Sequence, residues 1–152
     1  MTSYLVDINV WLALTWDLHP QHARASRWYT SLNQSDDSTL LFCRLTMLGF
    51  LRLLTNRAVM GDSTAAITGA LGIYDEWTLD PRVELAPEPR GLDKLFRETL
   101  GPVTLQPATK AIADCYLVGF AAASGVHIVT LDKGLASSAK AQKVAVTLLR
   151  PV

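Results

Sequence analysis

The fold of this chain is indicated first by the stretch YLVDINVWLAL, residues 4–14. Tyr4-Leu5-Val6 is a short apolar run of the kind that forms a buried strand, and it ends at Asp7. From Val10 to Trp16 the residues are apolar at helical spacing, which predicts a helix soon after the strand. The chain is therefore expected to open with a buried strand and a helix, with a carboxylate at the junction.

The alternation of apolar strands and helices continues along the rest of the chain. Further strands are predicted at Thr39–Cys43, Val83–Leu85, His127–Leu131 and Val144–Leu149. Helices are predicted at Gln21–Asn33, Leu45–Asn56, Thr64–Trp77 and Leu92–Leu100, from Pro107 or Ala108 to Ser124, and for a short stretch through Leu135. Strands that are apolar throughout are typical of a mostly parallel sheet covered by helices on both faces. We therefore predict an α/β fold in a single domain spanning residues 1–152.

Composition and charge set broad limits on function. Hydrophobic residues make up 49% of the 152 residues and charged residues 18%, so the chain can bury a sizeable core and disorder is not expected. Lys and Arg together number 14, as do Asp and Glu, so net charge neither favours nor excludes nucleic acid. Two segments, Ser38–Gly61 and Lys133–Val152, contain basic residues and no acid. They could attract a polyanion or be ordinary solvated surface charges.

The sequence also bears on the compartment. Cys43 and Cys115 lie in apolar surroundings, as buried free thiols of a reducing compartment do. The N-terminus lacks the basic region and apolar stretch of a signal peptide. The most apolar segment, Ala111–Val126, is too short to span a bilayer and contains Asp114. A soluble cytoplasmic protein with no membrane partner is expected.

Three aspartates are candidates for a shared site. Asp7 and Asp132 each follow a predicted strand, and ligands of open parallel sheets gather at the carboxyl ends of strands. Asp114 lies in the apolar helix and is the only charged residue between Lys110 and Asp132. A buried carboxylate must be paired, neutralised or bound to a metal. We therefore expect the three carboxylates to converge at one end of the sheet.

Each aspartate also has an ordinary structural explanation. Asp7 and Asp132 could cap the helices that follow them, and Asp114 could pair with Lys110 one turn earlier in its helix. Considered together, the three favour a common site, because clustered carboxylates repel one another and require a cation. Hard oxygen ligands select Mg²⁺ or Mn²⁺ over zinc.

Five blocks of sequence carry a family resemblance. They are Leu5–Leu14, His19–Trp28, Arg44–Asn56, Ala113–Leu117 and Val129–Leu135. In order and spacing they resemble the motifs of the PIN-domain family, in particular the VapC-type toxins of type II toxin–antitoxin systems. The blocks span almost the whole chain. The resemblance implies a PIN-like three-layer α/β/α fold with a mostly parallel central sheet.

The resemblance also implies an activity and partners. It implies a metal-dependent endoribonuclease that hydrolyses RNA phosphodiester bonds, with Mg²⁺ or Mn²⁺ held by the catalytic residues Asp7, Asp114 and Asp132. The ion would activate a water and offset charge on the scissile phosphate. The implied partners are the RNA substrate, a second copy of the chain, and a VapB-type antitoxin bound in a groove beside the acidic site. The helices around Trp11–Trp16 and Trp28–Leu32 are expected to line that groove.

Three further residues are expected to support the site. Asn9 and Thr130 stand next to ligand positions and could hydrogen-bond a carboxylate or a metal-bound water. Their alternative roles are a helix start and an ordinary strand residue. Arg52 resembles the arginine of the third family motif and could contact a phosphate, or it could form a surface ion pair.

One position departs from the family pattern. The family usually has a fourth acidic residue, a glutamate, and we place it at Met47, which is no ligand for a hard cation. An alternative function is therefore a catalytically weakened PIN-fold module that binds RNA or protein. If the helix from Leu45 points residue 47 into the site, Met47→Glu is expected to strengthen metal binding.

Two other functions are disfavoured by the residues that follow the first strand. An aspartyl phosphatase is disfavoured because Asn9 stands where that chemistry needs a second aspartate. Dinucleotide binding is disfavoured because no glycine-rich loop follows the first strand.

Overall fold

A computed structural model describes residues 1–32, 37–103 and 107–150 of the chain. In these residues, five strands form one parallel sheet in the order β3-β2-β1-β4-β5. The strands are β1 (Thr2–Val6), β2 (Ser38–Phe42), β3 (Val83–Leu85), β4 (His127–Thr130) and β5 (Val146–Leu148). The first strand of the chain is therefore the central strand of the sheet.

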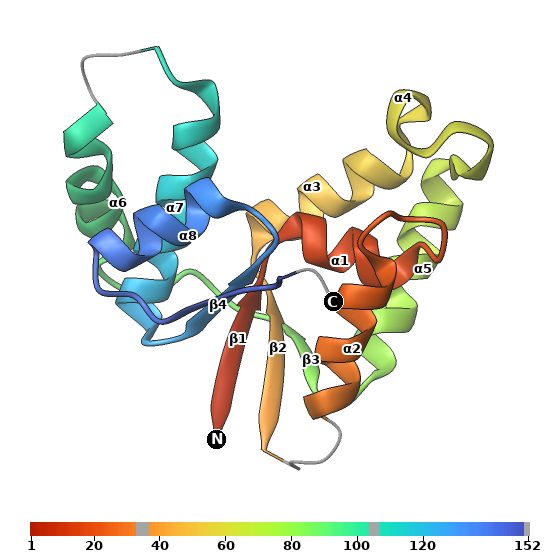
Figure 1. Ribbon diagram of the computed structural model, residues 1–152, viewed down its shortest axis with the longest axis horizontal. Coiled ribbons are helices and arrows are strands. Elements are labelled where there is room, and N and C mark those ends of the chain that lie inside the picture. The colour runs from red at the N-terminus through yellow and green to blue at the C-terminus, as the bar shows by residue number, and fades with distance from the viewer. Residues whose placement is uncertain (33–36, 104–106, 151–152) are drawn as a thin grey trace.

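Helices cover both faces of the sheet. The α-helices are α1 (Ile8–Thr15), α2 (His22–Leu32), α3 (Arg44–Leu54), α4 (Arg57–Met60), α5 (Ile67–Leu79), α6 (Leu92–Leu100), α7 (Thr109–Ser124) and α8 (Lys133–Ala141), and two 3-10 turns are η1 (Gly61–Ser63) and η2 (Gly101–Val103). Figure 1 shows α6, α7 and α8 on one side of the sheet and α1, α2, α3 and α5 on the other. The predicted three-layer α/β/α arrangement with a parallel sheet is confirmed.

The strands supply side chains to two separate cores. Successive residues of a strand point to opposite faces, so Leu5 and Ile128 join the cluster under α7 and α8. Val6 and Val129 join the cluster under α1, α2, α3 and α5. All four side chains are at most 1% exposed. Burial on both faces explains why β1 and β4 are apolar at these positions.

The tryptophans of α1 and α2 belong to the second of these cores. Trp11 is completely buried and stacks on Phe42 with 3.9 Å between the ring centroids. Trp16 and Trp28 are partly buried against the same cluster. The prediction that the segments Trp11–Trp16 and Trp28–Leu32 line a partner groove is therefore wrong, because their apolar faces pack in the core.

The connection between α3 and α5 differs from the prediction. The helix predicted to run to Asn56 ends at Leu54, and the Asn56 side chain accepts a hydrogen bond from the Ala58 N–H at 3.0 Å, which starts the additional helix α4. Gly61 then reverses the chain with a positive φ of 55°. The 3-10 turn η1 follows, and the helix predicted from Thr64 begins as α5 at Ile67.

The position of α7 is fixed by close packing on α6. A Cβ atom at Gly119 would lie 2.9 Å from the backbone nitrogen of Phe96, so only glycine permits this approach. The first turns of α7, which carry Lys110 and Asp114, are thereby held beside the carboxyl ends of β1 and β4. Within the described ranges, no helix is long and apolar enough to cross a membrane.

Candidate functional site

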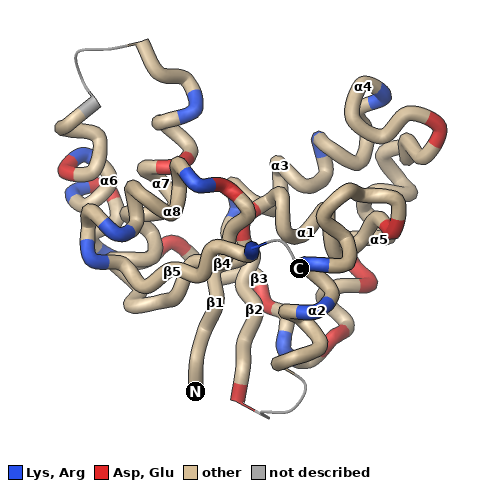
Figure 2. The backbone as a smooth tube through the Cα atoms, in the orientation of Figure 1, with Lys and Arg blue, Asp and Glu red and all other residues tan. Residues whose placement is uncertain are grey.

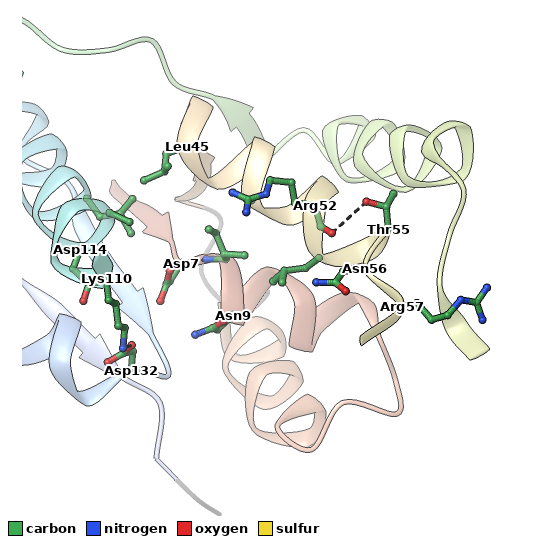
Figure 3. Close-up of a pocket in the computed structure, with 15 residues that line it drawn as sticks. Asp7, Asn9, Leu45, Arg52, Thr55, Asn56, Arg57, Lys110, Asp114 and Asp132 are labelled. Atoms are coloured by element: carbon green, nitrogen blue, oxygen red, sulfur yellow. Dashed lines mark hydrogen bonds and ion pairs between the residues drawn. The ribbon is translucent and has the colours of Figure 1, made fainter. Parts of the chain in front are cut away.

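A pocket opens at the carboxyl ends of β1 and β4. Its lining includes Asp7, Asp114 and Asp132. Asp7 lies between β1 and α1, Asp114 belongs to the second turn of α7, and Asp132 lies between β4 and α8. Figure 3 shows the three side chains on the same side of the pocket, and in Figure 2 acidic backbone positions lie near α7 and α8. The structure thus brings the three predicted carboxylates to one pocket, Asp7 and Asp132 because β1 and β4 end at the same edge of the sheet, and Asp114 because α7 lies beside that edge.

Asp7 is held by hydrogen bonds at both of its oxygens. The Ile8 N–H donates to Oδ1 at 2.8 Å, and the Thr130 hydroxyl donates to Oδ2 at 2.7 Å. Burial raises the pKa of Asp7, whereas the two hydrogen bonds act in the opposite direction. Thr130 is fully buried and also accepts a hydrogen bond from the Asp132 N–H at 2.9 Å. One buried hydroxyl therefore links the side chain of Asp7 to the backbone of Asp132.

Asp132 caps α8 and also meets a lysine. Its Oδ1 accepts hydrogen bonds from the N–H groups of Gly134, at 2.7 Å, and Leu135, at 3.2 Å. Its Oδ2 accepts a hydrogen bond from the ammonium of Lys110. Burial pushes the pKa of Asp132 upward, but the hydrogen bonds from Lys110 and from α8 outweigh it, so the pKa lies below its ordinary value.

Asp114 is partly buried in the wall that α7 contributes. Burial, followed by the negative charge of Asp132, raises the pKa of Asp114 to about 6. The ion pair considered from the sequence joined Asp114 to Lys110 one turn earlier. In the structure the ammonium of Lys110 reaches across to Asp132 instead. The carboxylate of Asp114 is thus left in surroundings that disfavour its charge.

Lys110 also belongs to the site. From the sequence it was considered only as a possible ion-pair partner of Asp114. It lines the pocket, and Figure 3 shows its side chain directed at Asp132. The hydrogen bond to Asp132 raises the pKa of Lys110, and the charges of Asp114 and Asp7 act in the same direction. A signal for this role was present in the sequence, because Lys110 is the one basic residue of α7 and Asp114 is its one acidic residue.

The chemistry of these ligands fits a divalent cation. Carboxylate oxygens are the donors that Mg²⁺ and Mn²⁺ prefer, and a positively charged ammonium already stands among them. Over residues 1–32, 37–103 and 107–150, however, no three His, Cys, Asp or Glu side chains are arranged so that they could hold one metal ion together. The donor set therefore fits a metal ion, whereas the arrangement of the side chains is that of a site bound to a lysine.

Helix α3 forms the opposite wall of the pocket. It presents one face, made of Leu45, Gly49, Arg52 and Leu53. Residue 47 lies about 200° around the helix from residue 45. Met47 is accordingly packed, partly buried, against the core under α1 and α2. The condition set for Met47→Glu, that residue 47 points into the site, is therefore not met, and Leu45 is the residue of this turn that lines the pocket.

The far end of the pocket is basic and polar. Arg52, predicted from the sequence, lines it together with Asn56 and Arg57, which were not predicted. Arg52 and Arg57 lie in the acid-free segment noted in the sequence, so the charge pattern was a usable signal. Asn9 lines the pocket between this end and Asp7 (Figure 3). One cavity thus joins carboxylates suited to a cation and guanidinium groups suited to phosphate.

Comparisons with known proteins agree with this geometry. The model of the PIN domain family matches residues 4–141. Ribonuclease VapC41 of Mycobacterium tuberculosis (strain ATCC 25618 / H37Rv) is 37% identical over 132 residues, which cover 84% of this chain and 88% of the relative. Ribonuclease VapC39 of the same strain is 34% identical over 144 residues, covering 93% and 97%. The crystal structure of VapBC2 from Rickettsia felis, bound to a DNA fragment from their promoter, aligns with a TM-score of 0.69 and 10% identity over 98% of this chain and 100% of that chain, a likeness of fold alone.

Proposed function

The chain belongs to the PIN domain family, and on this premise we propose that it is a Mg²⁺- or Mn²⁺-dependent endoribonuclease, the toxin of a VapBC-type pair. The observation that carries the proposal is the single pocket with Asp7, Asp114 and Asp132 at one end and Arg52 at the other. Two relatives named as ribonucleases support RNA as the substrate. The proposal treats residues 1–152 as one PIN domain.

Each residue of the pocket has a role in the proposed reaction. Asp7, Asp114 and Asp132 would hold the ion, which when bound supplies activation of a water and neutralisation of charge on the scissile phosphate. Thr130 fixes the orientation of the Asp7 carboxylate through its hydroxyl. Arg52 binds a phosphate of the RNA from the opposite wall, and so holds the scissile bond near the carboxylates.

The alternative, a binding module without catalysis, is not favoured. It arose from Met47, and that side chain packs in the core rather than in the pocket. The relatives that cover most of the chain are named as ribonucleases. The proposal therefore assigns metal binding to three carboxylates, with Leu45 on the wall where a fourth acid would reach the site.

We also propose that an antitoxin and a second copy of the chain are partners, in line with the fold that the chain shares with VapBC2. An apolar groove lies between α3 and α5, and its lining includes Leu48, Ile67 and Leu71, which are 50%, 72% and 40% exposed. Ile8, Leu45 and Gly49 line both this groove and the acidic pocket, so the two are continuous. An antitoxin segment in the groove would therefore reach the site.

Cleavage of an RNA pool tests the nuclease proposal. The purified chain should cut RNA with Mn²⁺ and stop in EDTA. Asp114→Asn should lower the rate by more than about a hundredfold, the upper end of the loss seen for residues that only support a ligand. Asp75→Asn is a matched control, because Asp75 is exposed on α5. If EDTA and Asp114→Asn both leave cleavage unchanged, the assignment of the metal site is wrong, and RNA retained without cleavage would establish the binding module.

A further inference from the structure

We propose that Lys110 is the resident cation of the acidic pocket, where its ammonium competes with the divalent ion and must withdraw before the ion binds. This inference rests on the proposed function, since it concerns the same carboxylates. It differs in assigning a role to a residue that lies outside the metal ligands. Lys110 then controls how readily the site takes up its ion.

The contact of Lys110 is made at the oxygen that a metal would need. At Asp132, Oδ1 is engaged by the N–H groups of Gly134 and Leu135 as the cap of α8. Oδ2 is the oxygen of Asp132 that faces the pocket, and it receives the ammonium of Lys110. A divalent ion bound to Oδ2 would stand where the ammonium stands. Two cations cannot share that position, so each excludes the other.

The charges of the pocket explain why a lysine is held there. Asp7, Asp114 and Asp132 contribute three negative charges to one pocket, and Lys110 contributes one positive charge. The ammonium relieves part of the repulsion that would otherwise act between the carboxylates. Without a metal, the lysine therefore stabilises the cluster. With a metal bound, the same charge opposes the ion.

The position of Lys110 allows it to leave. It is the second residue of α7, and its side chain is 69% exposed, whereas that of Asp132 is 15% exposed. A lysine side chain is a flexible stem with a strongly hydrated head, so it can move into solvent once its hydrogen bond to Asp132 breaks. Withdrawal would uncover Oδ2 of Asp132 and leave the backbone of α7 in place.

Binding of Mn²⁺, followed through the electron paramagnetic resonance signal of the free ion, tests the inference without any measurement of cleavage. Lys110→Gln should bind Mn²⁺ about tenfold more tightly than the parent, because one opposing charge near the ion is removed. Lys110→Arg keeps the charge and should bind like the parent within about twofold. Lys133→Gln is the matched control, because Lys133 is exposed and directly follows Asp132 and its loss changes net charge equally.

Thermal unfolding supplies a second readout. In EDTA, Lys110→Gln should melt below the parent because the carboxylates lose their counter-ion, and saturating Mn²⁺ should close or reverse that difference. Equal or weaker Mn²⁺ binding by Lys110→Gln beside a parent that binds the ion would overturn the inference and leave the nuclease proposal standing. An equal gain in Mn²⁺ affinity for Lys133→Gln would also overturn the inference, because it would show a general effect of net charge. Failure of the parent and of every variant to bind Mn²⁺ would overturn both proposals.

Discussion

Asp114 differs from Asp7 and Asp132 in the interactions that act on its carboxylate. Asp7 receives hydrogen bonds from Ile8 and Thr130, and Asp132 receives them from α8 and Lys110. Burial and the neighbouring charge of Asp132 instead raise the pKa of Asp114 from 3.8 to about 6. The folded chain therefore holds a proton at Asp114 over a pH range in which the unfolded chain has released it.

This shift predicts a stability gain for Asp114→Asn in the absence of metal. Between pH 4 and pH 6 the folded parent binds more protons at this site than the unfolded parent, so its stability falls as pH rises through the window set by 3.8 and about 6. Asp114→Asn has no titrating carboxyl group at this position, so it does not lose this stability as pH rises. Allowing for solvent screening, it should be more stable by about 1 kcal/mol at pH 7.5 and equal to the parent below about pH 4. Urea unfolding in EDTA at both pH values measures the difference, and an equal or lower stability at pH 7.5 would contradict the argument.

The sequence allowed the convergence of Asp7, Asp114 and Asp132 to be predicted, because the carboxyl ends of parallel strands meet at one edge. It did not allow the partner of Lys110 to be predicted. Asp114 is four residues away on the same helix, and Asp132 is in another element. The choice depends on how α7 packs against β4 and α8, which local spacing does not contain.

At the scale of single elements, α3 decides which side chains meet the pocket. Its pocket face contains Leu45, Gly49 and Arg52, and Met47 lies on another face against the core. The helix itself was predicted within two residues at each end. Its rotation about its own axis was not, because several faces of this helix are apolar and the spacing alone does not identify the one that meets the site.

The rotation of α3 predicts opposite outcomes for two substitutions to glutamate. Leu45→Glu would place a fourth carboxylate on the wall of the pocket and should tighten Mn²⁺ binding by about tenfold. Met47→Glu should leave Mn²⁺ affinity unchanged and lower the free energy of unfolding by about 1 kcal/mol or less, because a charge would be partly buried while the guanidinium of Arg44, which contacts the Met47 sulfur, offsets part of that cost. Mn²⁺ titration and urea unfolding of both variants separate the cases. Tighter binding by Met47→Glu and not by Leu45→Glu would show that α3 is rotated differently.

The short elements after α3 show another limit of local reasoning. The strand Val83–Leu85 and the helix Leu92–Leu100 have the bounds predicted for them. Helix α4 was missed because Asn56 was read as the end of one helix, whereas it caps the next. Polar residues at a boundary fit either role, and the hydrogen bond from the Ala58 N–H to the Asn56 side chain distinguishes the two.

At the scale of the whole molecule, the apolar groove between α3 and α5 is the surface that we propose a partner binds. Amphipathic spacing indicates that a helix has an apolar face, but not whether the core or another chain covers it. That ambiguity is why the groove was expected at Trp11–Trp16, whose apolar face proved to be core. The exposed side chains of Leu48, Ile67 and Leu71 identify the uncovered surface instead.

The groove predicts that binding of the antitoxin can be lost without loss of the enzyme. Leu48→Glu should weaken binding of a VapB-type antitoxin by about a hundredfold, because the charge would have to be buried in an apolar contact. Cleavage of RNA and the unfolding midpoint should stay close to those of the parent. Leu79→Glu is the control, since Leu79 ends α5 and is 81% exposed. Light scattering of the chain alone reports self-association. Loss of the dimer with the antitoxin still bound would assign the groove to a second copy instead.

The central place of β1 has a consequence for synthesis of the chain. β1 leaves the ribosome before the other four strands of the sheet, and the structure pairs it with β2 and with β4, which is made much later. A growing chain therefore carries Asp7 long before Asp114 and Asp132 have been translated. Any product released before β4 lacks Asp132 and the strand that supports Asp7 through Thr130. The pocket is completed only after β4 and Asp132 have been made, so under the proposed function a chain released earlier would lack the acidic site.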